Sequence, residues 1–380
     1  MAVAGALTFL GWLWWRGGNA PVPPAKPFAP EAKPPPSLRT NLPPLHVSRF
    51  TSHVSGPPPL KTNPPPTQAR IGPQPLPHPA VPATNAPPAS PGGFPRPAQN
   101  VFEAQVALAR RDISPGSIDG VAGRQTRQAL RAFQRKMHLP VTGVLDDATR
   151  QRLRLDRPAC APYTVTPQDL ARLQPLSRTW LGKSRQTALD YETILELVSE
   201  KGQANPGLVR RLNPAIDWNH VLPGTVLTLP DAGDPQQPVA SAAFIRIRLN
   251  ERVLEAFDTG GNLLAHFPCS IARRVAKRPI GELHVAVIVK NPSYTFDPAI
   301  FPESAEGRRL GRKLVLPPGP NNPVGAVWIG LDKPGYGIHG TPNPEAVGRT
   351  ESHGCFRLAN WNAEHLLKLV WIGLPVYVQH

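Results

Sequence analysis

The sequence predicts a multidomain protein: a small all-α domain of three helices, then a mostly-β domain that is a β-sandwich or flattened barrel with one C-terminal helix. Three observations predict this class. Apolar residues recur at helical spacing within residues 99–157 and alternate as in strands after residue 242. Between residues 20 and 98 large apolar residues are scarce and prolines gather. The length of 380 residues also favours more than one domain.

The first 98 residues divide into an apolar segment and a proline-rich tract. Residues 2–15 are apolar and would be about 21 Å long as a helix, shorter than the roughly 30 Å hydrocarbon core of a bilayer. We therefore expect residues 1–19 to be a signal peptide or a membrane anchor, and the sequence does not decide between the two. About half of the 51 prolines lie in residues 20–98, which we expect to be a disordered, partly polyproline II linker.

Residues 99–157 are expected to form the three-helix domain. The first helix begins near Val101, and the last follows Asp146, whose carboxylate is a suitable N-cap. The middle helix spans residues 123–137. Its apolar stripe repeats every three or four residues and consists of Thr126, Ala129, Leu130 and Phe133.

Residues 162–231 carry a weaker pattern. Residues 208–214 and 222–230 resemble the helix and the last strand of a LysM glycan-binding module. Residues 167–205 are longer than the middle of that module usually is. We expect either a diverged LysM-like domain with an insertion or a structural linker domain, because the resemblance depends on short apolar stretches.

The mostly-β domain is expected to span residues 242–380. Alternating side chains predict strands over residues 243–249, 252–257 and 263–269. Near the carboxyl end, Asn360 is expected to cap a helix over residues 361–371, before a last strand over residues 375–378.

The residues best suited to chemistry cluster in this last domain. Ser352-His353-Gly354-Cys355-Phe356-Arg357 follows His339-Gly340-Thr341 at short range. A cysteine is a useful nucleophile only as thiolate, so it needs an imidazole or a positive charge nearby. A cysteine taken alone is more often a small buried hydrophobe. A run of His, Gly, Cys and Arg is unusual in an apolar core strand, and it favours a functional thiol.

Strand geometry distinguishes the two histidines of the cluster. Residues two apart in a strand share a face at about 6.5 Å, so His353 looks the same way as Cys355 without reaching its sulfur. His339 ends an earlier apolar run, and a strand there would lie about 4.8 Å from the cysteine strand. We therefore expect His339 to serve as the base and His353 to support the site.

This pattern, a histidine followed after a spacer by Ser-His-Gly-Cys, resembles the active-site signature of L,D-transpeptidases, the YkuD-like enzymes of bacterial peptidoglycan. The resemblance covers about residues 243–378. It includes residues 278–282, although Arg278 and Leu283 replace the threonine and the aromatic residue of the family. Glycines and apolar residues between Ile118 and Thr149 are similar to those of the peptidoglycan-binding domain often joined to wall enzymes.

The resemblance implies the chemistry of three residues. Cys355 would attack the carbonyl of the third stem-peptide residue and expel the terminal D-alanine. His339 would take the thiol proton and later activate the acceptor amine. The backbone carbonyl of Gly340 would orient His339.

The remaining residues of the cluster would stabilise the oxyanion or bind the substrate. Backbone amides around Gly354, with His353 nearby, would hold the oxyanion. Arg357 and Ser352 would contact the substrate, with the guanidinium of Arg357 suited to a carboxylate. A structural salt bridge or a solvated charge is the alternative for Arg357.

The expected function is therefore that of a peptidoglycan L,D-transpeptidase that cross-links the cell wall. An L,D-carboxypeptidase or hydrolase acting on the same stem peptides is one alternative, and an inactive wall-binding scaffold is another. The expected partners are the stem peptides and glycan of peptidoglycan, with membrane association through residues 2–15 left open. We expect export to the periplasm or cell envelope and association with the cell wall.

Composition and residue spacing also bear on nucleic-acid binding, on metal and cofactor sites, and on disulfides. The net charge of +16 would suit nucleic acid, but no aromatic and basic recognition module accompanies it, so we expect no nucleic-acid partner. The cysteines and histidines lack zinc-ligand spacing, and no glycine-rich phosphate loop follows a strand, so we expect neither metal nor cofactor. Three cysteines make an odd count. Cys160 and Cys269 are candidates for a disulfide that sequence does not decide.

Overall fold

The computed structural model describes residues 93–233, 241–350, 352 and 354–380. The segment expected to be a signal peptide or membrane anchor, its membrane association through residues 2–15 and nearly all of the expected linker lie outside these residues. Within the described ranges, no helix combines the length and the apolar character that crossing a bilayer requires.

The first folded region contains the three predicted helices, which are α1 (Val101–Ala109), α2 (Arg124–Lys136) and α3 (Asp147–Arg152). An antiparallel pair, β1 (Arg96–Pro97) and β2 (Arg154–Leu155), ties its two ends together. Strand β1 thus lies inside the range 20–98 that was expected to be linker. The stripe of α2 is buried, and the side chain of Asp146 accepts a hydrogen bond from the amide of Thr149. The predicted N-cap is confirmed.

Residues 160–230 form a middle region around one antiparallel pair, β3 (Cys160–Thr164) and β4 (Val226–Pro230). Four helices lie between these strands: α4 (Pro167–Ala171), α5 (Trp180–Ser184), α6 (Ile194–Lys201) and α7 (Pro206–Leu212). Helix α7 and strand β4 coincide with the two stretches that resemble LysM. Helix α5 belongs to the long segment that departs from that module.

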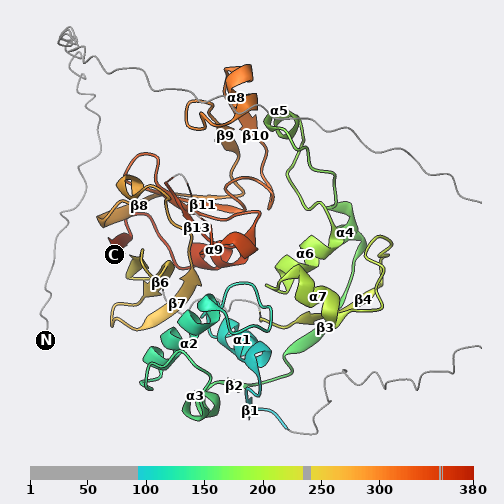
Figure 1. Cartoon of the computed structure of the whole chain (residues 1–380), viewed down its shortest axis with the longest axis vertical. Helices are drawn as coiled ribbons and strands as arrows, with labels where there is room; N and C mark the ends of the chain where they lie inside the picture. Colours follow the sequence, from blue (N-terminus) through green and yellow to red (C-terminus); the bar gives the residue numbers. More distant parts are fainter. Residues whose placement is uncertain (1–92, 234–240, 351, 353) are drawn as a thin grey trace, which may run out of the picture. The chain divides into compact units, whose positions relative to one another are not determined.

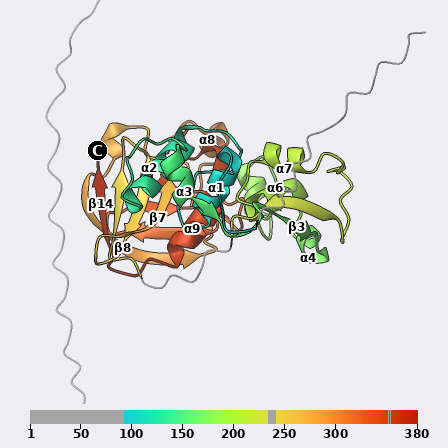
Figure 2. The ribbon, with the colours of Figure 1, turned by 90° about the horizontal axis from the view of Figure 1, so that it is seen from below.

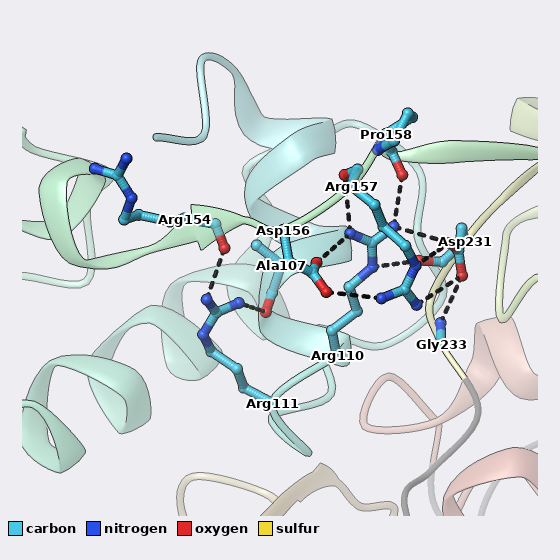
Figure 3. Close-up of polar contacts among 9 residues, drawn as sticks. All are labelled: Ala107, Arg110, Arg111, Arg154, Asp156, Arg157, Pro158, Asp231 and Gly233. Carbon is cyan, nitrogen blue, oxygen red and sulfur yellow. Dashed lines mark hydrogen bonds and ion pairs between the residues drawn. The ribbon is translucent and has the colours of Figure 1, made fainter. Parts of the chain in front are cut away.

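The helical and middle regions share one hydrophobic cluster. At their junction the guanidinium of Arg110, with a side chain only 5% exposed, forms an ion pair with Asp156 at 2.8 Å (Figure 3). It also donates to the carbonyl oxygens of Pro158 at 2.6 Å and of Asp231 at 2.8 Å. These contacts join the end of α1 to the segments before β3 and after β4, and residues 99–157 and 162–231 also pack through a common core.

The C-terminal region is built on one eight-stranded mixed sheet. In spatial order its strands are β13 (Phe356–Arg357), β12 (Gly337–His339), β11 (Val327–Leu331), β8 (Gly281–Lys290), β14 (Pro375–Gln379), β5 (Phe244–Arg248), β6 (Val253–Phe257) and β7 (Leu263–Pro268). The strands predicted over residues 243–249, 252–257, 263–269 and 375–378 are all present. The long strand β8 was not predicted, because its polar and apolar residues do not alternate against one buried face.

The two edges of this sheet meet, so the sheet closes into the expected flattened barrel. Ser270, just after β7, exchanges two backbone hydrogen bonds with Arg357 of β13, at 2.9 and 3.0 Å. The C-terminal helix α9 (Asn360–Leu367) contacts β11 and β12. Its N-cap is Ala359, and no side chain caps it, so the prediction that Asn360 is the cap is wrong. The Asn360 side chain is fully buried and bonds elsewhere.

A hairpin outside the main sheet consists of β9 (Tyr294–Phe296) and β10 (Leu314–Leu316), with helix α8 (Ala305–Leu310) between them. Helix α8 is a second helix in the C-terminal region, where only one was expected. Helix α5 of the middle region lies beside this hairpin, and the two share a small apolar cluster (Figure 1).

The helical region also contacts the barrel. Helix α2 packs against β7 (Figure 2), and Arg135 of α2 forms an ion pair with the buried carboxylate of Glu255 at 3.1 Å. Gln125 near the start of α2 donates to the carbonyl oxygen of Val347 at 2.6 Å. Val347 lies in the loop between β12 and β13, so the helical region holds part of the loop that precedes Cys355.

Candidate active site

The three cysteines occupy different environments, and all are free thiols, so Cys160 and Cys269 do not form a disulfide. Cys269 is fully buried in the barrel core, where burial raises its pKa to about 12. Burial also raises the pKa of Cys160 to about 11. Cys355 instead lines a cavity of about 630 Å³ together with His339. Position alone therefore favours Cys355 as the reactive thiol.

Strand pairing places the thiol and the imidazole on one face. Strands β12 and β13 are parallel neighbours, with Ile338 opposite Phe356 and His339 opposite Arg357. Side chains alternate along a strand, so Ile338 and Phe356 point into the core, where both are buried. His339 and Arg357 then project from the other face, as does Cys355, two residues before Arg357. All three line the cavity.

The geometry around His339 specifies its tautomer. Nδ1 lies 2.6 Å from the carbonyl oxygen of Gly340. A carbonyl only accepts, so Nδ1 carries the hydrogen and Nε2 carries the lone pair. Burial lowers the pKa of His339 to about 4, with a smaller contribution from the charge of Arg357, and the hydrogen bond to Gly340 only partly opposes this. The imidazole is therefore neutral near pH 7 and able to accept a proton. The Trp328 ring stacks 5.7 Å from it, centroid to centroid.

The thiol of Cys355 is protonated in this resting arrangement. Its sulfur donates to the carbonyl oxygen of Gly335 at 3.6 Å. Burial raises the pKa of Cys355, while a hydrogen bond from the Gly337 amide and the charge of Arg357 oppose that effect. A protonated thiol is a weak nucleophile, so attack on a carbonyl requires a base. The neutral imidazole of His339 lines the same cavity.

Ser352 shapes the turn that presents Cys355. Its hydroxyl donates to the carbonyl oxygen of Cys355 at 2.6 Å and accepts from the amide of Gly354 at 3.2 Å. The Gly354 amide must therefore exchange Ser352 for the substrate oxygen before it can stabilise an oxyanion. His353, expected to support the oxyanion, lies outside the described residues.

Arg357 supplies positive charge at the cavity wall. Its backbone closes the barrel through Ser270, and its guanidinium donates to the hydroxyl of Thr350 at 3.1 Å. Lys277 adds a second cation to the lining. The apolar part of the lining includes Trp180, Tyr294, Ile300, Phe301 and Val324. Among the residues that the structure describes, no three or more His, Cys, Asp or Glu side chains gather as metal ligands would.

Asn360 is a positioning residue that sequence reasoning missed. Its Oδ1 accepts from the amide of Ala326 at 3.2 Å, and a Cβ on Gly340 would lie only 2.3 Å from the same oxygen. A larger residue at position 340 would clash with the Asn360 side chain, so this position requires glycine. Asn360 therefore packs against the backbone of Gly340, whose carbonyl accepts from His339. In the sequence, a polar residue at the start of a helix is normally interpreted as an N-cap. Asn360 was therefore not recognised as a residue of the site.

The other end of the Asn360 amide reaches the middle region. Nδ2 lies 3.2 Å from each carboxyl oxygen of Glu200, which also accepts from the hydroxyl of Tyr191 at 3.1 Å. Burial, helped by the nearby carboxylates of Glu364 and Glu196, raises the pKa of Glu200 from 4.5 to about 8, although the hydrogen bonds from Asn360 and Tyr191 oppose this. The acid is therefore mostly protonated at neutral pH.

This raised pKa predicts a pH-dependent stability. Between pH 4.5 and 8 the folded chain holds a proton on Glu200 that the unfolded chain has released. The free energy of unfolding should therefore fall by up to about 1.4 kcal/mol per pH unit as pH rises through that window. Glu200→Gln should flatten this dependence in urea titrations at pH 5, 6.5 and 8. Glu192→Gln, a half-exposed carboxyl of the same region, serves as control. An unchanged slope in Glu200→Gln would contradict the assignment.

Two family models match the chain in the regions just described. Residues 242–378 match the L,D-transpeptidase catalytic domain (YkuD), and residues 97–153 match a putative peptidoglycan-binding domain. Neither match includes residues 162–231, where the LysM-like interpretation stays a prediction.

Curated relatives carry the same description. A putative L,D-transpeptidase YkuD of Bacillus licheniformis is 26% identical over 187 residues, which cover 49% of this chain and 93% of the relative. A putative L,D-transpeptidase YqjB of Bacillus subtilis is 35% identical over 105 residues, which cover 26% of this chain and 51% of the relative. A solved L,D-transpeptidase from Xylanimonas cellulosilytica is 15% identical, covering 77% of this chain and all of that chain at a TM-score of 0.30. The chain is thus similar to L,D-transpeptidase catalytic domains of the YkuD family over residues 242–378 and to putative peptidoglycan-binding domains over residues 97–153.

Proposed function

We propose that this protein is a peptidoglycan L,D-transpeptidase with Cys355 as its nucleophile. One observation carries the proposal: a neutral imidazole, held through Nδ1 by the Gly340 carbonyl, shares a strand face and a cavity with a protonated thiol. The match of the surrounding barrel to the L,D-transpeptidase catalytic domain supports the reaction class.

The first half-reaction forms a thioester. Nε2 of His339 takes the proton of Cys355, and the sulfur attacks the carbonyl carbon of the third residue of a tetrapeptide stem. Backbone amides of the turn at Gly354 stabilise the oxyanion after the Gly354 amide releases Ser352. The tetrahedral intermediate then breaks its C–N bond, and the departing D-alanine amine receives the proton from His339.

The second half-reaction frees the enzyme. The amine of an acceptor stem attacks the thioester carbonyl, and His339 takes a proton from that amine. The C–S bond breaks, the sulfur of Cys355 regains a proton, and a new amide joins the two stems. Attack by water at the same carbon would instead release a tripeptide, which is the carboxypeptidase outcome.

We also propose that the protein works on the wall itself. The match of residues 97–153 to a peptidoglycan-binding domain supports peptidoglycan as the partner of the helical region. Arg357 and Lys277 supply charge for the carboxylates of stem peptides. An envelope location, reached by export, follows from such a substrate.

Product analysis tests the proposal. The full chain is incubated with a disaccharide tetrapeptide, and the products are separated and weighed by mass spectrometry. We expect free D-alanine together with cross-linked dimers. D-alanine without dimers would make the protein a carboxypeptidase or hydrolase. Intact substrate, together with retention of the chain on insoluble peptidoglycan, would favour a wall-binding scaffold.

A further inference from the structure

One wall of the Cys355 cavity comes from a different part of the chain. Trp180, the first residue of α5, lines the cavity with Cys355 and His339. It belongs to the middle region, in the long segment between β3 and β4 that departs from a LysM module. The figure shows α5 beside β9, β10 and α8 (Figure 1). The candidate active site is therefore assembled from two regions.

Aromatic stacking holds Trp180 in place. Its ring lies 4.3 Å from that of Phe296, centroid to centroid, at an interplanar angle of 14°. Phe296 is fully buried and stacks in turn on Phe301 at 5.5 Å. One carboxylate then ties the backbone of α5 to the hairpin, because Glu306 accepts from the amides of Trp180 and Leu181, both at 2.9 Å. Trp180 is thus a fixed part of the wall.

The same segment is anchored a second time at Leu189. Its amide donates to the carbonyl oxygen of Pro318 at 2.8 Å, and its carbonyl accepts from the amide of Asn321 at 2.9 Å. A Cβ on Gly319 would lie 2.1 Å from the Leu189 carbonyl oxygen, so the backbones touch. The chain then continues from Asn321 to Val324, which also lines the cavity. Residues 180–189 are therefore held to the cavity rim at both ends.

We propose that Trp180 is a specificity-determining residue of the Cys355 site, one that contacts the C–H-rich face of the bound substrate. Trp180, Tyr294, Ile300, Phe301 and Val324 give the cavity an apolar side, which attracts aliphatic groups and pyranose C–H faces rather than carboxylates. A cavity of about 630 Å³ is large enough for an extended peptide. The inference rests on the proposed function for the identity of the substrate.

The test compares substrate turnover with thiol reactivity. Trp180→Ala should lower kcat/KM for D-alanine release about tenfold to a hundredfold, mainly through KM, whereas Trp180→Phe should restore most of it. The rate at which iodoacetamide alkylates Cys355, followed by mass spectrometry, should differ by no more than about twofold between Trp180→Ala and the unsubstituted protein. This small probe does not depend on contacts with the apolar wall. Trp218→Ala, a partly exposed tryptophan of the same middle region, is the matched control and should match the unsubstituted protein.

Two substrates identify the contacted group. Equal losses with a free tetrapeptide and with a disaccharide tetrapeptide place the contact on the peptide, while a loss confined to the disaccharide form places it on the sugar. Unchanged kcat/KM for both substrates would overturn the inference. So would a parallel loss of Cys355 alkylation, because that result would mean that the cavity had collapsed.

A binding measurement tests the role of Trp180 independently of the proposed catalytic function. If the unsubstituted chain turns over neither peptide, the proposed function fails, and calorimetric titration of Cys355→Ala with the disaccharide tetrapeptide decides about Trp180. Saturable binding that weakens at least tenfold in Cys355→Ala/Trp180→Ala keeps the inference. No binding, or equal binding by both variants, overturns it.

Discussion

Replacing Cys355 by alanine is expected to lower the rate of D-alanine release from a disaccharide tetrapeptide by roughly a thousandfold or more. The substitution removes the atom that forms the thioester, and the cavity offers no second thiol to replace it. Of the other two cysteines, Cys269 is buried in the core, and burial raises the pKa of Cys160 to about 11. Mass spectrometry should also find no acyl adduct on the variant after brief exposure to substrate.

A matched variant makes this result interpretable. Cys160→Ala removes a half-buried thiol outside the site and should leave turnover unchanged. Circular dichroism and the melting temperature of Cys355→Ala should match those of the unsubstituted chain, because the removed sulfur faces a cavity rather than the core. Full activity in Cys355→Ala would remove Cys355 as the nucleophile.

Replacing His339 by glutamine is expected to lower kcat about a hundredfold to ten-thousandfold. Glutamine can still meet the Gly340 carbonyl through its amide hydrogens, but it cannot accept the proton of Cys355. Because burial raises the pKa of Cys355, almost no thiolate forms at neutral pH without a base. His284→Gln, a half-exposed histidine on β8 paired with Asp332, is the control and should retain activity.

The lowered pKa of His339 also predicts how activity changes with pH. The pKa of His339 is lowered to about 4, so the imidazole is a competent base above that pH and becomes protonated below it. The activity of the unsubstituted protein should therefore fall as pH drops through about 4. His339→Gln should lose this acid limb, and its residual rate should rise with pH as Cys355 ionises. Equal profiles for the two proteins would exclude His339 as the base.

Local patterns in the sequence predicted the elements well where apolar residues recur at a regular spacing. The stripe around Phe133 predicted α2, and Asp146 predicted the start of α3. Strand alternation predicted β5, β6 and β7. The same reasoning missed β8, and it also missed the β9–β10 hairpin, whose strands are only three residues long.

Some residues of the candidate site could likewise be predicted from the sequence, and others could not. Residue types and their spacing indicated Cys355 and His339, because a nucleophile and a base leave a chemical signature within a short segment. Asn360 leaves no such signature, since an amide at a helix start usually caps that helix. Its contact with Gly340 depends on how α9 packs against β11 and β12.

The sequence by itself determined the helical and β-rich regions and the identities of the thiol and the imidazole, because these depend on side-chain chemistry and on periodicities of two to four residues. Only the tertiary structure decided which surfaces meet. Parallel pairing of β12 and β13 aligns His339 and Cys355, and the closure at Ser270 places Arg357 beside them. Trp180 reaches the cavity through packing across more than a hundred residues of chain. Contacts of that range depend on the summed fit of whole elements, which no short stretch of sequence encodes.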